Sequence, residues 1–372
     1  SVGNSIVSER EFDWQGDDYE LPPWNELVIY EMHVGTFGRK PGNNGDNGSD
    51  FDGIERQFDH LAKLGINVIQ LMPIGEFAGT VSWGYNPSHI FAVSNDYGGP
   101  WELKQFIKNA HAHGLGVILD VVYNHFGPTD LDLWQFDGWS DNGKGGIYFY
   151  NDWRSQTPWG ETRPDYGRDE VRRYIRDNAL MWIEDYHFDG LRFDMTFYMR
   201  AVDHSGDSDI PAGWSLMQWI NQEIDERVPN CITIAEDLQN NAALTRSPAE
   251  GGAGFGSQWD AGFVHPVRDL LEAPHDEQRS METLRRAIEH GYNHDAFQRV
   301  IYTESHDEVA NGKARVTEEI DDQNVGNWFA QKRSTLGAAL VLTAPGIPML
   351  FQGQEFLQGD WFDDQTPLDW EQ

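Results

Sequence analysis

A carboxylic acid follows a short apolar run near the middle of the chain. Arg192 lies within the run 190–193, and Asp194 comes directly after it. In a buried strand, residues two apart lie on the same face, which would place the guanidinium beside the carboxylate. A neighbouring cation favours the ionised carboxylate, as a carboxylate nucleophile requires. A structural ion pair is the alternative interpretation of the same two residues.

Other polar side chains have the same position, at or just beyond the end of an apolar run. They are Asp120, Asn124, His125, Glu236, Asp237, His306 and Asp307. Two carboxyl groups that flank a sugar–sugar bond are the groups used in glycoside cleavage. One must be an ionised nucleophile, and Arg192 favours Asp194 for that role.

The second carboxyl must be a protonated acid with a raised pKa. Glu236 has no cation adjacent in sequence, so it is the expected general acid. Asp307 is expected to stabilise positive charge on the sugar ring or to hold its hydroxyls. His125 and His306 are suited to hydrogen bonds with sugar hydroxyls, with structural or metal-binding roles as alternatives.

Short apolar strands alternate with helices along the chain. The expected strands are 27–34, 67–71, 116–122, 190–193, 231–235, 257–259, 299–303 and 347–351. The expected helices are 51–64, 101–113, 169–186, 214–227, 264–271, 281–290 and 328–342. Eight such repeats predict an α/β fold, a closed (β/α)8 barrel whose active site forms at the carboxyl ends of the strands. The residues after Phe351 lack the pattern of a further helix, so the barrel is expected to be truncated after its eighth strand.

The barrel is expected to occupy residues 27–372, with 1–26 as a polar lead-in segment. Residues 126–168 form a long insertion rich in Gly, Asp and Trp. A loop of this length inside a compact domain is usually functional. The insertion is therefore expected to shape the substrate cleft.

Composition excludes several classes of partner. The net charge of −34 argues against nucleic acid and against anionic membranes, because both require basic patches. It indicates a strongly hydrated surface, from adaptation to salt or from solubility alone. No apolar run is long enough to span a membrane and no signal peptide opens the chain, so a cytoplasmic enzyme is expected. The single cysteine, Cys231, excludes an intrachain disulfide.

No metal and no cofactor are expected. Asp46, Asn47, Ser49 and Asp50 carry oxygen ligands, but their spacing does not follow the 12-residue calcium loop. No close-spaced histidine pair supports a zinc site. The glycine-rich segment 251–256 lacks the Lys-Ser/Thr ending of a phosphate-binding loop, so a flexible loop is the simpler interpretation.

Four segments in order resemble the signature regions of the α-amylase superfamily of retaining glycosidases and transglycosylases. They are 120–125, 190–194, 234–236 and 305–307, with further matches at 83–87, 163–165 and 351–356. The resemblance implies that Asp194 is the nucleophile, Glu236 the general acid/base and Asp307 the transition-state stabiliser.

The same resemblance implies roles for the residues around these acids. Tyr85 would stack on the sugar at the cleavage point, and Asp120 would brace Arg192. His125, Arg192 and His306 would bind that sugar or position the nucleophile. Many α-amylases bind calcium near a residue that matches Asn124, but the two groups most similar to this chain generally do not, so no structural calcium is expected.

Those two groups are the glycogen (1,4-α-glucan) branching enzymes and the trehalohydrolases. Segments 305–309, 312–313 and 353–370 resemble the first group, whereas 30–35 and 120–128 also occur in the second. Both groups usually carry flanking β-domains, which are not expected in this chain. The resemblance implies an α-glucan or maltooligosaccharide substrate and favours branching by transfer to a 6-hydroxyl. Hydrolysis of the trehalohydrolase or α-amylase type is the alternative, and a glucan-binding protein without activity would require the loss of a catalytic acid.

Overall fold

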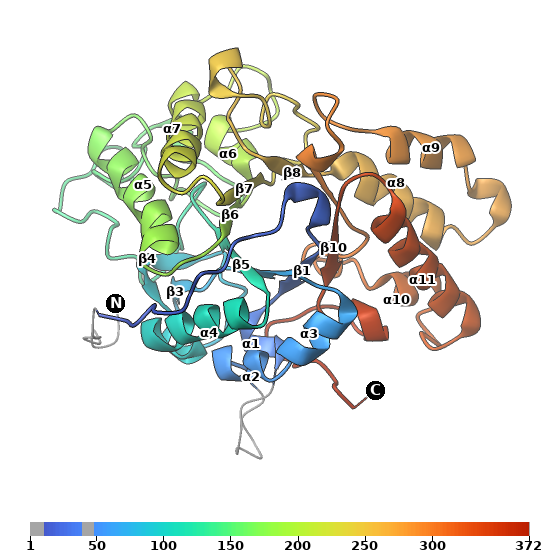
Figure 1. Ribbon diagram of the computed structural model, residues 1–372. Coiled ribbons are helices and arrows are strands. Elements are labelled where there is room, and N and C mark those ends of the chain that lie inside the picture. The colour runs from blue at the N-terminus through green and yellow to red at the C-terminus, as the bar shows by residue number, and fades with distance from the viewer. Residues whose placement is uncertain (1–10, 39–47, 372) are drawn as a thin grey trace.

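Eight parallel strands close into a barrel, as expected from the sequence (Figure 1). The computed structural model describes residues 11–38 and 48–371. The barrel strands are β1 (Ile29–Met32), β2 (Val68–Leu71), β5 (Gly116–Val121), β6 (Gly190–Phe193), β7 (Ile232–Ala235), β8 (Ser257–Trp259), β9 (Arg299–Ile301) and β10 (Ile347–Phe351). Their order around the barrel is β1, β10, β9, β8, β7, β6, β5 and β2. Consecutive strands are therefore neighbours, and β10 closes the barrel against β1.

Helices surround this barrel (Figure 1). They are α1 (Val34–Phe37), α2 (Phe51–Glu55), α3 (Phe58–Leu64), α4 (Pro100–Ala112), α5 (Asp169–Glu184), α6 (Thr196–Arg200), α7 (Pro211–Arg227), α8 (Ala261–Glu272), α9 (Met281–Glu289), α10 (Val316–Ile320) and α11 (Trp328–Thr343). The helix expected over 51–64 is broken into α2 and α3 at Arg56 and Gln57. Gly65 ends α3 with φ of 91°, a conformation that glycine adopts without steric cost. Within 352–371, the 3-10 turn Gln354–Phe356 is the one helical element that follows β10.

The barrel strands are buried on both faces, which is the normal environment of a parallel sheet covered by helices. All residues of β1, β2, β5, β6 and β7 are buried. Such strands appear in the sequence as continuous apolar runs, so a polar residue inside one requires a partner. Glu31, Asp120 and Arg192 are polar residues of this kind, and all three lie in one cluster described below.

A small antiparallel sheet lies where the sequence predicted only a loop. Strands β3 (Gly75–Phe77) and β4 (Pro87–Val93) pair with two irregularities in register. The initial Pro87 and these irregularities explain why a regular strand pattern was not recognised. Tyr85 lies in the connection between the two strands, so the sheet fixes the base of the loop that carries it.

The insertion 126–168 is ordered by packing and turns rather than by long helices or strands. It contains the 3-10 turn Trp153–Ser155 and isolated bridges between Phe149 and Pro164 and between Thr157 and Gly160. Arg163 is fully buried and donates to the carbonyl oxygens of Ala201 and Gln156. The insertion is therefore attached to the loop that follows β6.

The described part of the lead-in segment, residues 11–26, crosses the barrel before it enters β1 (Figure 1). It is attached through Asp17, whose Oδ1 lies 2.6 Å from His111 Nδ1 and whose Oδ2 lies 2.9 Å from His187 Nδ1. His111 Nε2 also lies 3.0 Å from Asp189 Oδ2. Because both ring nitrogens of His111 face carboxylate oxygens, both must carry protons. Burial opposes this charge, but Asp189 and Asp17 outweigh it and raise the pKa of His111.

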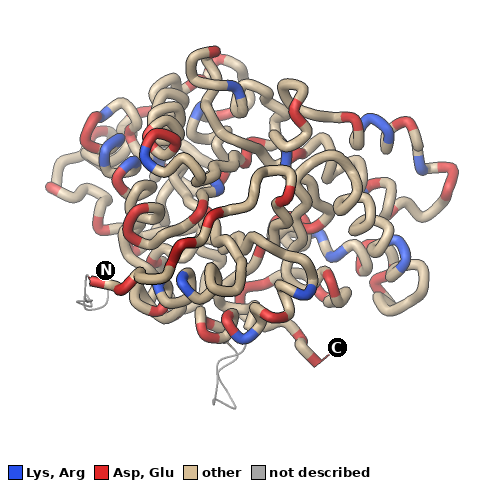
Figure 2. Tube along the Cα trace, in the orientation of Figure 1, with Lys and Arg blue, Asp and Glu red and all other residues tan. Residues whose placement is uncertain are grey.

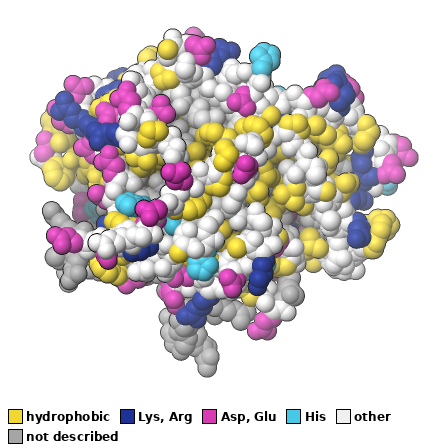
Figure 3. All heavy atoms as spheres, in the orientation of Figure 1, with side chains coloured by type: hydrophobic (Ala, Val, Ile, Leu, Met, Phe, Trp, Pro, Cys, Tyr) yellow, Lys and Arg dark blue, Asp and Glu magenta, His cyan; other side chains and the backbone are white. Residues whose placement is uncertain are grey.

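Acidic residues are distributed along the whole trace (Figure 2). On the face shown in Figure 3, hydrophobic side chains are exposed toward the middle and acidic side chains are common around them. Among the helices of residues 11–38 and 48–371, none combines the length and apolarity needed to cross a membrane.

We predict that the Asp17 contact stabilises the fold in a pH-dependent manner. Asp17→Asn should lower the free energy of unfolding by roughly 1–3 kcal/mol at pH 6, because it removes one carboxylate from a buried imidazolium. The pKa of His111 is raised above its unfolded value of about 6.5. Its stabilising contribution is therefore complete below that value and is lost as pH rises through the folded-state pKa.

Urea unfolding of the native chain and the variant at pH 6 and at pH 9 measures this difference. Asp18→Asn is the matched control, because Asp18 is an exposed neighbour with the same charge. An Asp17→Asn effect that is equal at both pH values, or no larger than that of Asp18→Asn, would contradict the prediction.

Candidate active site

A buried arginine contacts three carboxyl groups at the carboxyl ends of β5, β6 and β7. Arg192 Nη1 lies 2.5 Å from Asp120 Oδ2 and 3.2 Å from Asp194 Oδ1. Arg192 Nη2 lies 2.7 Å from Glu236 Oε2. The pairing of β5 with β6 places Asp120 directly opposite Arg192. The guanidinium also lies over the Trp259 ring, 4.2 Å from its centroid, so one of its faces packs on an aromatic ring.

Asp194 is held by two polar neighbours. Besides Arg192, Asn124 Nδ2 donates to Asp194 Oδ2 at 2.7 Å. Burial raises the pKa of Asp194 to about 6, while Arg192 and Asn124 oppose that rise. The group is therefore ionised at neutral pH although it is almost completely buried.

Glu236 follows β7 and is more difficult to ionise than Asp194. Its Oε2 accepts from the backbone N–H of Met195 at 3.0 Å. Burial raises the pKa of Glu236 to about 8; Arg192 lowers it, and the charges of Asp194 and Asp307 raise it. Its other oxygen, Oε1, is buried without a hydrogen-bond partner in the described chain, as suits a group that carries a proton.

A cation lies beside Glu236 in space, although none is adjacent to it in sequence. Arg192 contacts Glu236 at a shorter distance than it contacts Asp194. The partners of the cation come from adjacent strands, and strand neighbours are not adjacent in sequence. The difference in pKa between Asp194 and Glu236 therefore does not arise from exclusive pairing of Asp194 with Arg192. It arises from the Asn124 hydrogen bond to Asp194 and from the charge of Asp194, which raises the pKa of Glu236.

Tyr85 and Asp120 form the wall next to Arg192. The Tyr85 hydroxyl donates to Asp120 Oδ2 at 2.6 Å, and the Tyr85 ring stacks on His306 with 4.8 Å between centroids. Burial raises the pKa of Asp120 to about 6 against the opposing effect of Arg192. The loop between β3 and β4 thereby joins the cluster formed at the strand ends.

His306 is paired with an acid that the sequence analysis did not select. Glu31 Oε1 lies 2.7 Å from His306 Nδ1, and Glu31 Oε2 accepts from the His306 backbone N–H at 3.0 Å. Burial disfavours the imidazolium, but the charges of Glu31 and Asp307 outweigh it and raise the pKa of His306 to about 9. An acid inside the apolar strand 29–32 was the available signal, since an unpaired charge is not stable there.

His125 and Asp307 complete the set expected from the sequence. His125 Nε2 donates to the Tyr85 carbonyl oxygen at 2.8 Å, and burial lowers the pKa of His125 to about 4, which keeps it neutral. The Asp307 side chain is 44% exposed and its Oδ2 lies 3.6 Å from His306 Nε2. The structure thus brings together all eight predicted site residues, with Asp307 the most accessible of the three predicted catalytic acids.

Two tryptophans in the site were missed. Trp159, from the insertion, stacks on His125 with 4.6 Å between ring centroids, and Trp259 lies under Arg192. Trp159 is 42% exposed, so part of its ring is available to a ligand. In a sequence with 15 tryptophans, residue type alone does not identify the ones in a site.

Over residues 11–38 and 48–371, no group of three or more His, Cys, Asp or Glu side chains is arranged to hold a metal ion. Asp46 and Asn47 lie outside the described residues. Ser49 accepts from the Gly38 N–H, and Asp50 caps α2 by accepting from the Gly53 N–H.

The fold agrees with comparisons to known proteins. The chain belongs to the family described as alpha amylase, catalytic domain, whose model matches residues 39–134 and 131–369. It is 30% identical to a 1,4-alpha-glucan branching enzyme GlgB of Pseudoalteromonas atlantica, over 100% of this chain and 52% of that protein. It is 29% identical to a malto-oligosyltrehalose trehalohydrolase of Saccharolobus solfataricus, over 95% of this chain and 61% of that protein.

A solved structure supports the same assignment. A putative alpha amylase from Salmonella typhimurium superimposes with a TM-score of 0.74 at 27% identity, over 96% of this chain and 61% of the other. The chain spans about half the length of the curated branching enzymes that it matches. The superfamily predicted from the sequence motifs is therefore confirmed.

We predict that His306 titrates near pH 9 and that Glu31 is responsible. In NMR titrations of the imidazole, Glu31→Gln should lower the pKa of His306 toward or below its ordinary value of about 6.5, because burial then acts with less opposition. Glu355→Gln is the matched control, because that buried acid contacts Tyr30 and His60 instead. A His306 pKa that is equal in the native chain and Glu31→Gln would show that Glu31 is not the cause.

Proposed function

We propose that this chain catalyses transfer of α-1,4-glucan segments with retention of configuration, through a covalent glycosyl-aspartate intermediate on Asp194. The favoured acceptor is a glucan 6-hydroxyl, which makes the reaction 1,4-α-glucan branching. The observation that carries the proposal is the pair Asp194 and Glu236. The two carboxyls share one guanidinium, yet Asp194 has a pKa of about 6 and Glu236 a pKa of about 8.

These values suit opposite roles at neutral pH. Glu236 would donate its proton to the glycosidic oxygen as the bond to the leaving segment breaks, while ionised Asp194 attacks the anomeric carbon. Glu236 would then be a carboxylate and would remove the proton from the acceptor hydroxyl as that oxygen displaces Asp194. Water in place of the glucan hydroxyl would give hydrolysis by the same two carboxyls.

The surrounding residues support this assignment by position. Asp307, the accessible acid at the mouth, would stabilise positive charge that develops on the sugar ring. Tyr85, with its ring held against His306, would present a flat surface to the sugar. His306 would donate to a sugar hydroxyl through Nε2, and His125 would hold the Tyr85 loop through its bond to the Tyr85 carbonyl oxygen. Asp120 would hold Arg192 between the two reacting acids.

Branching is favoured over hydrolysis by the segment after β9. This segment includes residues 305–309 and Gly312-Lys313, which resemble branching enzymes. An ion pair connects the two parts, because Lys313 Nζ lies 3.0 Å from Glu308 Oε1. Glu308 also lies 3.2 Å from His265 Nε2. This pairing would fix the loop that carries Asp307 on one side of the cleft.

Products formed from amylose test the choice of acceptor. We expect new α-1,6 linkages, measured by proton NMR and by the chains that isoamylase releases, with little increase in reducing ends. Glu236→Gln serves as the inactive control. An increase in reducing ends without new α-1,6 linkages would show that the reaction is hydrolysis and not branching.

We predict that Asp194→Asn lowers turnover of amylose by roughly three orders of magnitude or more, because the amide cannot form the intermediate. Circular dichroism should show an unchanged fold. With a 5-fluoro-α-glucosyl fluoride, the native chain should gain a mass label on the peptide that contains Asp194. Asp203→Asn is the control, since Asp203 is an exposed aspartate outside the acid cluster. A label on a different acid, or activity within a few-fold of native, would refute the nucleophile assignment.

A further inference from the structure

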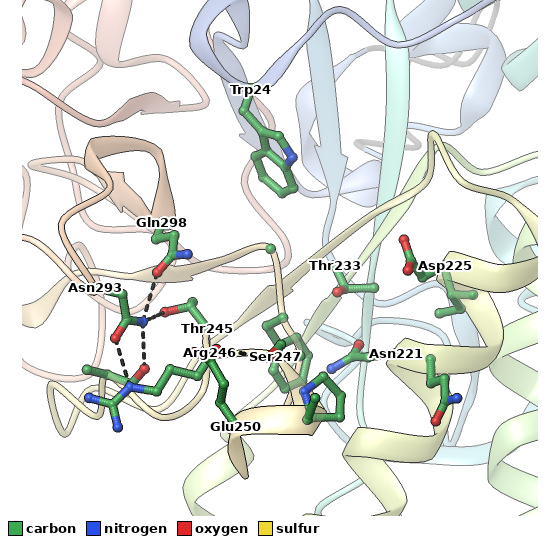
Figure 4. Close-up of a pocket in the computed structure, with 18 of the residues that line it drawn as sticks. Trp24, Asn221, Asp225, Thr233, Thr245, Arg246, Ser247, Glu250, Asn293 and Gln298 are labelled. Atoms are coloured by element: carbon green, nitrogen blue, oxygen red, sulfur yellow. Dashed lines mark hydrogen bonds between the residues drawn. The ribbon is translucent and has the colours of Figure 1, made fainter.

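A large cavity lies at the end of the barrel opposite the acid cluster. Figure 4 shows residues that line it. Cys231, Gly256 and Gln298 line it, and each comes immediately before a strand: β7, β8 or β9. Asp194 and Glu236 instead follow strands. At about 3.3 Å per residue, Cys231 and Glu236 are separated by roughly 16 Å along β7. The cavity is therefore separate from the proposed active site.

The volume of this cavity is about 1240 Å³, above the range of roughly 300–1,000 Å³ for sites that hold one small molecule. A second cavity of about 620 Å³ shares Trp24, Gly256 and Gln298 with it. Trp24 therefore lines both open volumes. The space suits an extended ligand of several units rather than a single ring.

Neutral hydrogen-bonding side chains form much of the wall. They are Asn221, Thr233, Thr245, Asn293 and Gln298. Asn293 Nδ2 donates to Thr245 Oγ1 at 3.0 Å and to Gln298 Oε1 at 2.9 Å, as Figure 4 shows. These bonds fix the orientation of the Gln298 amide before any ligand binds.

One of these groups lacks a partner. Asn221 is 5% exposed, and its Nδ2 donates to the Ala253 carbonyl oxygen at 2.8 Å. Its Oδ1 is buried and has no hydrogen-bond partner in the part of the chain that the structure describes. A buried carbonyl oxygen without a donor is unfavourable. Because this oxygen is closed to solvent, the polar contacts available to a ligand come from the other wall residues.

Trp24 supplies a rigid apolar surface beside these amides. It is half-buried in the 3-10 turn Trp24–Glu26, and a side chain at Gly256 would clash with its ring. The indole is thus held in place by close packing on backbone. Aromatic rings with this combination of apolar face and polar surroundings suit ligands whose faces are C–H bonds and whose edges are hydroxyls.

The charges of the rim exclude anionic ligands. Asp225, Glu226 and Glu250 line the cavity with Arg246 as their counterpart, so negative charge is in excess there. Nucleotides and phosphorylated sugars would meet repulsion. The chemistry of the walls is complementary to an uncharged polyhydroxylated chain.

We propose that this cavity is a second carbohydrate-binding site, which holds a segment of an α-1,4-glucan away from the reacting acids. The carbohydrate class follows from the cavity itself, whereas the choice of an α-glucan rests on the proposed function. Binding here would increase the local concentration of a long polymer without taking part in bond cleavage. Trp24 is the main contact, and Thr233 and Gln298 donate to or accept from the hydroxyls of the ligand.

The test is calorimetric binding of maltoheptaose to the full 372-residue chain carrying Glu236→Gln, which prevents turnover. We expect about two sites per chain. Adding Trp24→Ala should weaken one site on the order of tenfold and leave the other unchanged. Thr233→Val, which removes a hydroxyl from the wall with little change of shape, should weaken the same site. Trp328→Ala, at a 63% exposed tryptophan of α11, is the matched control and should change neither.

Two further measurements make the result independent of activity. Maltoheptaose should slow the reaction of Cys231 with a thiol reagent, and this protection should be lost in Trp24→Ala. In the otherwise native chain, Trp24→Ala should leave the rate on maltotetraose unchanged and reduce the rate on amylose. If Trp24→Ala and Thr233→Val both leave binding and Cys231 protection unchanged, the proposed site is wrong.

These outcomes also separate the site from the proposed function. If the native chain is inactive on amylose but Trp24→Ala weakens maltoheptaose binding, the second binding site is supported and the proposed function is refuted. If the native chain is active on amylose but has a single maltoheptaose site that Trp24→Ala does not change, the proposed function is supported and the second binding site is refuted. If the cavity binds cellohexaose as tightly as maltoheptaose, it is a carbohydrate site, but its assignment to α-glucans is wrong.

Discussion

The burial of Arg192 is the constraint on which the rest of the site depends. A guanidinium without access to water is stable only with anionic partners, and Asp120, Asp194 and Glu236 supply them. Glu31 and His306 add a further carboxylate and a further cation to the same buried region. Two cations then face four carboxyls, so ionisation of all four would leave excess negative charge in a low-dielectric interior. A proton on one carboxyl reduces this excess, and Glu236, whose pKa is raised by burial and by the charges of Asp194 and Asp307, is suited to hold it.

Strand register provides the geometry that this charge balance requires. Asp120 lies opposite Arg192 across β5 and β6, and β6 pairs with β7 so that Glu236 follows directly at the next strand end. A slip of one residue in either pairing would turn these side chains to the opposite face of the sheet. The apolar residues of the strands therefore do more than build the core, because their packing against the helices fixes the register that gathers the acids.

Much of the site could be predicted because its residues follow strands that are easily recognised. Asp194 follows Arg192 by two residues, and this spacing alone places them together in any buried strand. The cation beside Glu236 could not be predicted in the same way, because it comes from the neighbouring strand. Glu31 lies within a strand rather than after one, and its partner His306 is distant in sequence. The cavity around Trp24 depends on loops whose relative positions follow from tertiary packing rather than from any local pattern.

The acid pair cannot by itself select an acceptor. In the proposed mechanism, once a glycosyl group is bound to Asp194, Glu236 would be equally able to remove a proton from water or from a sugar hydroxyl. Selection must come from groups that exclude water or hold a second glucan beside the intermediate. Trp159 lies where such a group would act, because the insertion places its partly exposed ring against His125, at the edge of the acid cluster. A change of reaction within this fold therefore requires changes in loops such as 126–168, while Arg192 and its carboxyls can remain as they are.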